Sequence, residues 1–366
     1  MSDAPKIVDL FAGAGGMSEG FRQAGFVSAL AIEYDEMASR TFNFNHPTTP
    51  ILTKDIREIQ EAELRGLIRD QIVDVVCGGP PCQGFSLAGQ RLADDPRNQL
   101  FLEYIRILNL IRPRFFVLEN VSGITSMAGG AILDAILGEF RKAGYECTFK
   151  VLNAADYGVP QARPRFFLVG SRDGEKYRFP DPSHIPGTVN DLFLSNTPTH
   201  LTVWDALSDL PVIEQGDGSE ELLHLVPPNN EYQLERRGHR LPGLLFNHRA
   251  TGHSEPIIRR YDAIPEGGNN SQVPQEMRTK KINVFKLHRE KPSRTVTCNH
   301  RTDLLHPVIP RGTTVREAAR LQSFDDDYRF FGNLTRKAKW VTQDDQVGNA
   351  VPPLLARAIA YSLLKT

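Results

Sequence analysis

Residues 9–21 read DLFAGAGGMSEGF, and this stretch decides the fold. The apolar run KIVDLF (6–11) leads into the glycines, and a segment of helical character, SEGFRQAG (18–25), follows them. A strand, a glycine-rich turn and a helix in this order are typical of the ligand-binding edge of a doubly wound α/β fold, where Gly13 and Gly15 let the backbone approach a nucleotide closely. Taken alone, the glycines also fit a tight turn without a ligand, because they do not complete a G-x-G-x-x-G pattern.

Strand and helix patterns alternate from this stretch onward. Short apolar runs typical of buried strands recur at 28–34, 73–79, 114–121 and 165–171, and segments with helical spacing lie between them. This alternation predicts an α/β fold, with a doubly wound, mostly parallel sheet covered by helices on both faces.

The pattern changes after Ser171. Residues 172–310 are rich in Pro, Gly, Asn and His and show little periodicity, which indicates loops and short strands. Helical spacing returns at 314–324, where Thr314 and Glu317 form a capping-box pattern.

Two domains follow from these patterns. We expect residues 1–180 to form the α/β domain, completed by the C-terminal segment 342–366, whose last helical pattern is apolar nearly all round. We expect residues 181–341 to form a second, smaller and irregular α+β or β domain.

The net charge of −1 conceals a strong segregation of charge along the chain. Residues 181–230 contain eight acidic residues and no Lys or Arg, whereas residues 231–301 contain fourteen Lys or Arg and seven acidic residues. The second stretch predicts a surface that can bind a polyanion, and a solvated surface of mixed charge is the alternative. The acidic stretch would then face away from that polyanion.

Several classes of protein are excluded by composition. The chain has no run of eighteen apolar residues and no N-terminal signal pattern, so we expect a cytoplasmic protein without a membrane span. Its four cysteines follow no zinc-binding spacing, and we therefore expect no metal.

One cysteine stands where neither helix nor strand can continue. The segment GGPPCQGFS (78–86) follows an apolar strand pattern, so Cys82 should reach the carboxyl edge of the sheet, where ligands bind in such folds. Prolines make the backbone before it rigid, which favours a nucleophile over a buried apolar thiol. Cys77, within the strand pattern, fits the buried role.

Charged residues close two later strand patterns. Glu119 ends RFFVLENV (114–121), and a carboxyl group at that edge suits proton donation, although a strand-end Glu can also reach solvent. In QARPRFFLVG (161–170), Arg163 and Arg165 alternate at strand spacing, so both should point the same way. Paired guanidinium groups suit a polar ligand or an internal ion pair.

Three further polar residues are candidates for cofactor binding. Glu33 ends the second strand pattern 20 residues after Gly13, where an acidic residue typically holds ribose hydroxyls. Asp55, in the next loop, could accept from an exocyclic amine or serve as a turn residue. Asn349 precedes the final helical pattern and is also a common cap residue.

Six motifs together resemble the cytosine-C5 DNA methyltransferase family, in its stand-alone bacterial form. DLFAGAGG, GGPPCQGFS, ENV, QARPR, TVREAARLQSF and QVGNAVPP stand in the family's order along nearly the whole chain. The resemblance implies an S-adenosylmethionine-dependent methyltransferase fold, a catalytic and cofactor-binding first domain and a target recognition second domain. It also implies a monomer that acts on duplex DNA in a restriction-modification system, alongside a cognate endonuclease.

The resemblance assigns the catalytic roles. Cys82 would attack C6 of cytosine, Glu119 would hydrogen-bond N3 and the amino group, and Arg165 would hold O2. Arg163 would support Cys82 and the pocket. The methyl donor would be S-adenosylmethionine, with Tyr34 and Ile56 on either side of its adenine. The matching cofactor positions are Phe11, Gly13, Gly15, Gly16, Glu33, Tyr34, Asp55, Ile56, Pro81, Asn349 and Val351.

The target carbon is inaccessible inside a duplex, and methyltransferases of this kind flip the base out. The loop 83–99 would close on DNA, and the basic stretch 231–301 would contact phosphates and groove edges. The DNA-contacting residues expected in these two segments are Ser86, Arg91, Arg97, Arg259 and Arg260.

Three alternatives stay open at this point. A tRNA cytosine-C5 methyltransferase of the same family would share every motif. An amino methyltransferase would carry an Asp/Asn-Pro-Pro-aromatic motif in place of Pro-Pro-Cys. A DNA-binding regulator without activity would retain the scaffold alone.

Overall fold

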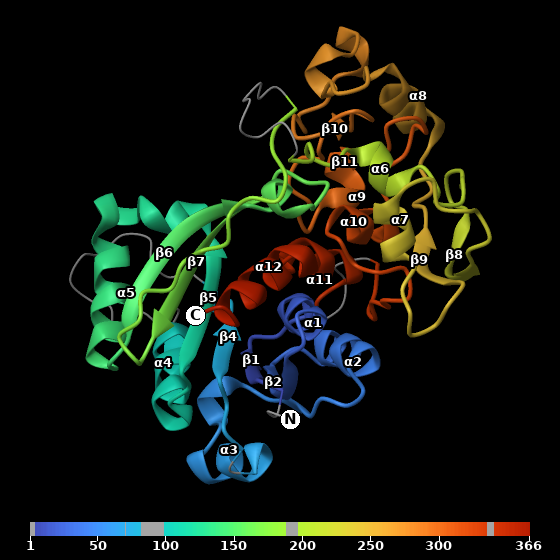
Figure 1. Cartoon of the computed structure of the whole chain (residues 1–366). Helices are drawn as coiled ribbons and strands as arrows, with labels where there is room; N and C mark the ends of the chain where they lie inside the picture. The colour runs from blue at the N-terminus through green and yellow to red at the C-terminus, as the bar shows by residue number, and fades with distance from the viewer. Residues whose placement is uncertain (1–3, 70, 82–98, 188–196, 335–339) are drawn as a thin grey trace. The chain divides into compact units, whose positions relative to one another are not determined.

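The computed structural model describes residues 4–69, 71–81, 99–187, 197–334 and 340–366 (Figure 1). The chain divides into two compact units. The first contains Met1–Asn153, Pro164–Asp181 and Pro353–Thr366, and the second contains Ala154–Arg163 and Pro182–Pro352.

A seven-stranded sheet forms the centre of the first unit, in the order β3-β2-β1-β4-β5-β7-β6. The neighbours from β3 to β5 pair in parallel, whereas β7 is antiparallel to both β5 and β6. The strands are β1 (Lys6–Leu10), β2 (Val27–Glu33), β3 (Ile51–Thr53), β4 (Val75–Gly78), β5 (Phe115–Val121), β6 (Glu146–Asn153) and β7 (Pro164–Ser171). The predicted doubly wound, mostly parallel α/β fold is confirmed.

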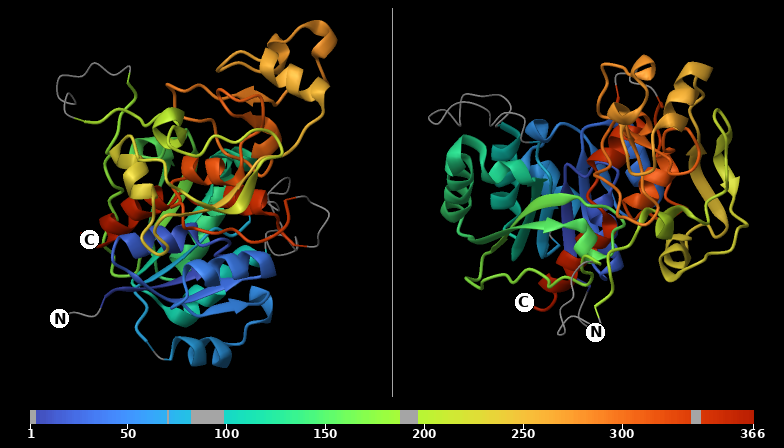
Figure 2. Two further views of the ribbon diagram at one scale, coloured as in Figure 1. Left: turned by 90° about the vertical axis from the view of Figure 1, so that its right-hand side faces the viewer. Right: turned by 90° about the horizontal axis from the view of Figure 1, so that it is seen from above.

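Helices cover both faces of this sheet, as Figure 2 shows. The helices are α1 (Gly16–Gln23), α2 (Glu36–Asn45), α3 (Glu61–Ile68), α4 (Gln99–Ile111), α5 (Ala131–Lys142) and α12 (Pro353–Leu363). The helices α3, α4 and α5 pack in one apolar cluster with the strand residues Leu30, Ile32, Phe116 and Leu118. On the opposite face, Phe42 of α2 packs against Ala31.

Two close contacts in this unit require glycine. A Cβ atom on Gly170 of β7 would lie 2.0 Å from the ring of Phe116, which stacks on Phe140 of α5 with ring centroids 4.1 Å apart. A Cβ atom on Gly20 of α1 would lie 2.4 Å from the carbonyl oxygen of Pro353. The final helix therefore packs directly against α1, and the prediction that it is buried in the first domain is confirmed.

The boundaries of the units differ from those expected at residues 180 and 342. Residues 342–352 belong to the second unit, because α11 (Gln343–Asn349) packs on α10 (Val315–Leu321) and the side chain of Gln322 donates to the carbonyl oxygen of Val347. Residues 154–163 also belong to it, because the buried side chain of Gln161 bonds to residues of that unit.

The second unit contains short elements and little sheet. The strands β8 (Gly218–Leu223) and β9 (Leu244–Arg249) pair antiparallel, and β10 (Phe285–Lys286) pairs in parallel with β11 (Leu304–Leu305). Its remaining helices are α6 (Val203–Leu207), α7 (Glu231–Arg236), α8 (Glu255–Ala263) and α9 (His300–Asp303). The predicted capping box is confirmed at the start of α10, where Thr314 and Glu317 satisfy each other's backbone amides.

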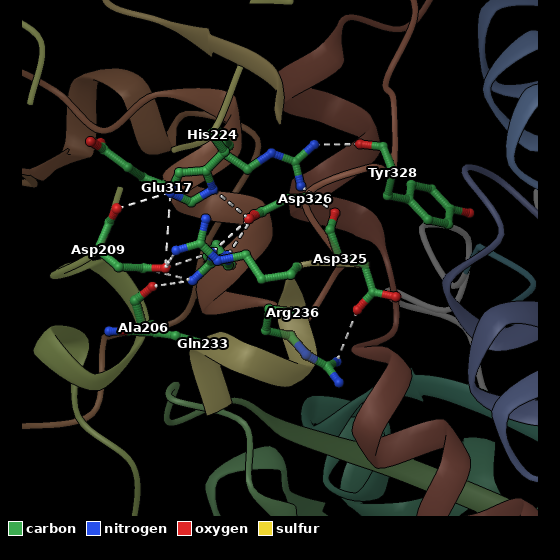
Figure 3. Close-up of polar contacts among 12 residues, drawn as sticks. Ala206, Asp209, His224, Gln233, Arg236, Glu317, Asp325, Asp326 and Tyr328 are labelled. Carbon is green, nitrogen blue, oxygen red and sulfur yellow. Dashed lines mark hydrogen bonds and ion pairs between the residues drawn. The ribbon is translucent and has the colours of Figure 1, made fainter. Parts of the chain in front are cut away.

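A cluster of buried charged side chains lies at α10. Arg320 is fully buried, and its guanidinium group lies 2.6 Å from Asp326 and 3.1 Å from Asp209. His224 donates or accepts at 3.0 Å to Asp326, and Figure 3 shows its ring between the two carboxylates. These contacts join Asp209, which follows α6, and His224 to Arg320 of α10 and to Asp326, which follows α10. They connect distant parts of the otherwise irregular second unit.

Candidate active site

The glycine-rich turn after β1 contains three residues with left-handed backbone conformation. Phe11, Gly13 and Gly15 have φ angles of 57°, 55° and 92°. A Cβ atom on Gly13 would meet no atom within 4 Å, so open space lies above the turn. The turn therefore offers a ligand close access to the backbone, as expected from the glycines.

Glu33, at the end of β2, anchors this turn. Its carboxylate accepts hydrogen bonds from the amides of Gly13 and Asp35, each at 2.8 Å. Burial raises the pKa of Glu33, and these hydrogen bonds oppose that rise. The second strand and the turn after the first are thus joined at the carboxyl edge of the sheet.

A buried carboxyl group supports the same turn from below. Gly15 caps α1 without a side chain, and Asp9 of β1 replaces that cap by accepting from the hydroxyl of Ser18 at 2.7 Å and from its amide. The thiol of Cys77 on β4 also hydrogen-bonds Asp9. Cys77 is therefore the buried thiol that the sequence predicted. Sequence reasoning missed Asp9, whose only signal is an acid inside an apolar strand.

Asp9 should make folding less favourable as the pH rises. Burial raises its pKa from 3.8 to about 7. Between pH 4 and pH 7 the folded protein keeps a proton that the unfolded chain has lost, so stability falls across that window by about 4 kcal/mol. Asp9→Asn keeps an acceptor for Ser18 and should remove this part of the pH dependence, measured by urea unfolding at several pH values. Identical pH profiles for both proteins would contradict the assignment.

The predicted adenine-binding positions lie at the ends of β2 and β3. The side chain of Tyr34 is exposed and that of Ile56 is buried. Asp55 caps the short helix Ile56–Glu58 by accepting from the amide of Arg57 at 2.9 Å, and it forms an ion pair with the Arg57 side chain. This contact lowers the pKa of Asp55. These contacts are those of a turn residue, one of the two roles that the sequence left open for Asp55.

Glu119 and Arg165 face each other across two paired strands. Val121 of β5 lies opposite Arg165 of β7 in the antiparallel register, and Nε of Arg165 lies 3.0 Å from Oε1 of Glu119. Both side chains are largely buried, at 14% and 12% exposed. Burial lowers the pKa of Arg165, and the carboxylate opposes that shift. A fixed pair of this kind presents both a carboxylate and a guanidinium group to a polar ligand.

The chain leading to Cys82 packs against this pair. A Cβ atom on Gly79 would lie 3.1 Å from Oε2 of Glu119, and the side chain of Asn120 donates to the carbonyl oxygen of Pro80 at 2.9 Å. Pro81 is exposed, and Cys82 itself lies outside the described residues. Asn120 was not among the predicted residues, although it stands in the ENV motif.

Arg163 does not share the strand alternation that the sequence predicted for it with Arg165. It precedes β7, which begins at Pro164, so the strand alternation that aligned it with Arg165 does not apply. Its buried guanidinium group donates to the carbonyl oxygens of Val296, Gly348 and Ala350. Two of these carbonyls flank Asn349, so Arg163 fixes the backbone on both sides of that residue.

The remaining predicted residues are spread over the chain. Asn349 is exposed at the end of α11, with its side-chain oxygen 3.1 Å from the sulfur of Cys298, and Val351 is buried. Arg259 and Arg260 lie on α8, where Arg259 pairs with Glu255 and Arg260 lies over the ring of Tyr261. Gly16 begins α1. The expected DNA contacts Ser86, Arg91 and Arg97 lie outside the described residues.

Several of the positively charged residues in 231–301 form ion pairs within the second unit. Arg237 pairs at 2.6 Å with Asp209, which comes from the acidic stretch, and β8 of that stretch pairs with β9 of the basic one. Arg240 and Arg301 pair with Asp327 and Asp344. The two stretches are therefore interleaved at these residues.

The fold and this edge define a methyltransferase of the S-adenosylmethionine-dependent type. A protein described as a DNA modification methyltransferase encoded within an E. coli prophage superimposes with a TM-score of 0.78, at 28% identity over 99% of both chains. The S. pombe Dnmt2 methyltransferase, at 15% identity and a TM-score of 0.61, shares the fold over 99% of this chain and 98% of its own.

The chain belongs to the C-5 cytosine-specific DNA methylase family, whose model matches residues 5–365. It is 40% identical to the type II methyltransferase M.DdeI of Desulfomicrobium norvegicum, over 97% of this chain and 87% of that protein. It is 38% identical to M1.HphI of Haemophilus parahaemolyticus, over 98% and 86%. The predicted family and the predicted enzyme, a DNA (cytosine-5-)-methyltransferase, are confirmed. In the described parts of the chain, no helix has the length and apolar character needed to cross a membrane.

Proposed function

We propose that the chain methylates C5 of a flipped-out cytosine in duplex DNA through a bond between the sulfur of Cys82 and C6 of the ring. The observation that carries this proposal is the ion pair of Glu119 and Arg165, against which Gly79 packs at the carboxyl edge of the sheet. The glycine-rich turn after β1 ends at the same edge, as expected for adjoining substrate and cofactor sites.

Each residue of this edge has a chemical role in the proposal. The thiolate of Cys82 adds to C6, which makes C5 nucleophilic toward the methyl group. Glu119 hydrogen-bonds N3 and the exocyclic amino group, and Arg165 donates to O2. After methylation, the C5 proton leaves to a base, the C5–C6 double bond re-forms, and the sulfur departs as thiolate.

The residues at the glycine-rich turn fit S-adenosylmethionine, which would supply an electrophilic methyl group. An ionised carboxylate has about four acceptor sites, more than the amides of Gly13, Tyr34 and Asp35 occupy on Glu33, so ribose hydroxyls can still bind there. The open space above Gly13 admits a ligand, and the exposed ring of Tyr34 offers an apolar face to adenine. We assign the other cofactor positions as the resemblance implies them, with Asn349 held by Arg163.

The first compact unit is the catalytic and cofactor-binding domain in this proposal, and the second is the target recognition domain. Loop 83–99 and α8, with Arg259 and Arg260, contact the DNA. The protein acts as a cytoplasmic monomer in a restriction-modification system, beside an endonuclease of the same specificity. The full-length similarity to type II methyltransferases supports this setting.

Methyl incorporation into two nucleic acids tests the substrate. Purified protein with labelled S-adenosylmethionine should label duplex DNA, and bisulfite sequencing of that DNA should show modified cytosines at one recurring sequence. Unmodified tRNA, offered at the same cytosine concentration, should stay unlabelled. Label in tRNA alone would replace DNA with tRNA as the substrate, and label on an exocyclic amine would contradict the proposed chemistry.

A further inference from the structure

A groove of about 540 Å³ lies in the second unit, beside β10 and β11. Arg294, Phe285, Asn283 and Thr295 line it, together with Asp303 at the end of α9. They lie in or next to the basic stretch 231–301, but none of them has been assigned an individual role above. The groove combines a cation, an aromatic ring and neutral donors, which is the chemistry of a nucleic-acid contact.

Arg294 provides the charge of the groove in a fixed orientation. The guanidinium carbon lies 3.9 Å from the centroid of the Phe285 ring, and the side chain is exposed. Among the residues that the structure describes, no carboxylate pairs with it, whereas Asp303 is paired with Lys281 at 2.7 Å. The acid in the groove is thus neutralised within the protein, and the N–H groups of Arg294 remain available to an anion.

Hydrogen bonds hold the backbone on both sides of the groove residues Ala162 and Thr295. Gln161, fully buried, accepts from the amide of Val296 at 2.8 Å and donates to the carbonyl oxygen of Leu321 at 3.0 Å. The hydroxyl of Thr295 donates to the carbonyl oxygen of Ala162 at 2.9 Å. The backbone that carries Arg294 is therefore held in place before any ligand arrives, which lowers the entropy lost on binding.

The covalent chain places the groove close to the proposed base-binding pair. Ala162 lines the groove and precedes Arg165 by three residues. Three trans peptides span at most about 11 Å between Cα atoms, however the two units are arranged. Phosphates of one DNA strand recur about every 3.4 Å along the axis, so only a few nucleotides separate the groove from the base held at Arg165.

We propose that this groove binds the phosphodiester backbone of the substrate strand, within a few nucleotides of the target cytosine, with Arg294 as the anion-binding residue. The inference rests on the proposed function, because it requires DNA as the substrate and Arg165 at the target base. The contact carries no sequence information, since every nucleotide offers the same phosphate.

Arg294→Ala tests the charge. DNA binding, measured by fluorescence anisotropy over a range of salt concentrations, should weaken by about tenfold, and the salt slope of log K should fall by about one. The loss should be equal for target and non-target duplexes. Arg289→Ala is the matched control, because Arg289 is also exposed in the second unit but pairs with Glu266 at 3.0 Å. It should leave affinity and slope unchanged.

Neutral phosphates locate the contact. Once the target sequence is known, duplexes with a single methylphosphonate at each position within three nucleotides of the target cytosine should bind wild-type protein more weakly at one position. Arg294→Ala should be insensitive at that position, whereas Arg289→Ala should respond like wild type. The inference would be overturned if Arg294→Ala responded to the methylphosphonate at every position as wild type does. The proposed function would still stand if wild-type protein methylated the DNA. If wild-type protein did not methylate DNA at all, the proposed function itself would be contradicted.

Discussion

Replacing Cys82 with serine should abolish methyl transfer while leaving the fold and cofactor binding intact. A serine hydroxyl is far less ionised and less nucleophilic than a thiol, so the ring would no longer be activated at C5. Removal of a covalent nucleophile lowers turnover by roughly 10³-fold or more. Turnover is measured with labelled methyl donor and duplex DNA, and cofactor affinity by calorimetry on the same preparation.

A matched substitution separates this effect from general damage. Cys147 lies half-buried on β6, where its thiol donates weakly to the carbonyl oxygen of Tyr145, and Cys147→Ser should keep near-normal activity. DNA carrying 5-fluorocytosine at the target should trap wild-type protein as a covalent adduct, because fluorine cannot leave as the proton does. Cys82→Ser should form none. An active Cys82→Ser protein would rule out this nucleophile.

The centre of the fold follows from sequence because its pattern is local. The buried strands β1, β2, β4 and β5 are short, mostly apolar segments, which a sequence displays directly. The strand β3 is too short to show a period. The strand β6 lies at the edge of the sheet with Phe149 and Val151 exposed, so its apolar residues do not mark a buried face.

The geometry of the candidate site could not be predicted from any single segment of the sequence. Glu119 and Arg165 meet because β7 pairs antiparallel with β5, a register set by tertiary packing rather than by either motif. Arg163 was misread for the opposite reason. Its motif looks like strand throughout, but β7 begins only at Pro164, and the guanidinium group of Arg163 donates to carbonyl oxygens of the second unit. The charge segregation along the sequence does not persist in the structure, because the pairing of β8 with β9 brings the two stretches together.

Arg320→Met should destabilise the second unit more than any exposed substitution in it. The guanidinium group of Arg320 is fully buried between Asp326, at 2.6 Å, and Asp209, at 3.1 Å, and it also donates to the carbonyl oxygen of Ala206. Methionine fills a similar volume but leaves the buried carboxylate of Asp326 without its guanidinium partner, while Asp209 keeps its ion pair with Arg237. Breaking a buried pair in this way costs about 3–5 kcal/mol. Urea unfolding followed by circular dichroism, with hydrogen exchange at α10 to assign the unit, measures the loss.

The pH dependence of that loss distinguishes charge from packing. In the wild type, Arg320 helps hold the pKa of Asp326 well below its usual range, so this contribution to stability is present at neutral pH and is lost only as the pH falls through the lowered pKa. Without the guanidinium group of Arg320, burial should raise the pKa of Asp326, and Arg320→Met should recover part of its deficit between pH 7 and pH 4 as Asp326 becomes protonated. Arg259→Met, which removes an exposed pair with Glu255, should change stability by less than about 1 kcal/mol at any pH. A deficit for Arg320→Met that stays constant with pH would mean that lost packing, rather than the uncompensated carboxylate of Asp326, destabilises the unit.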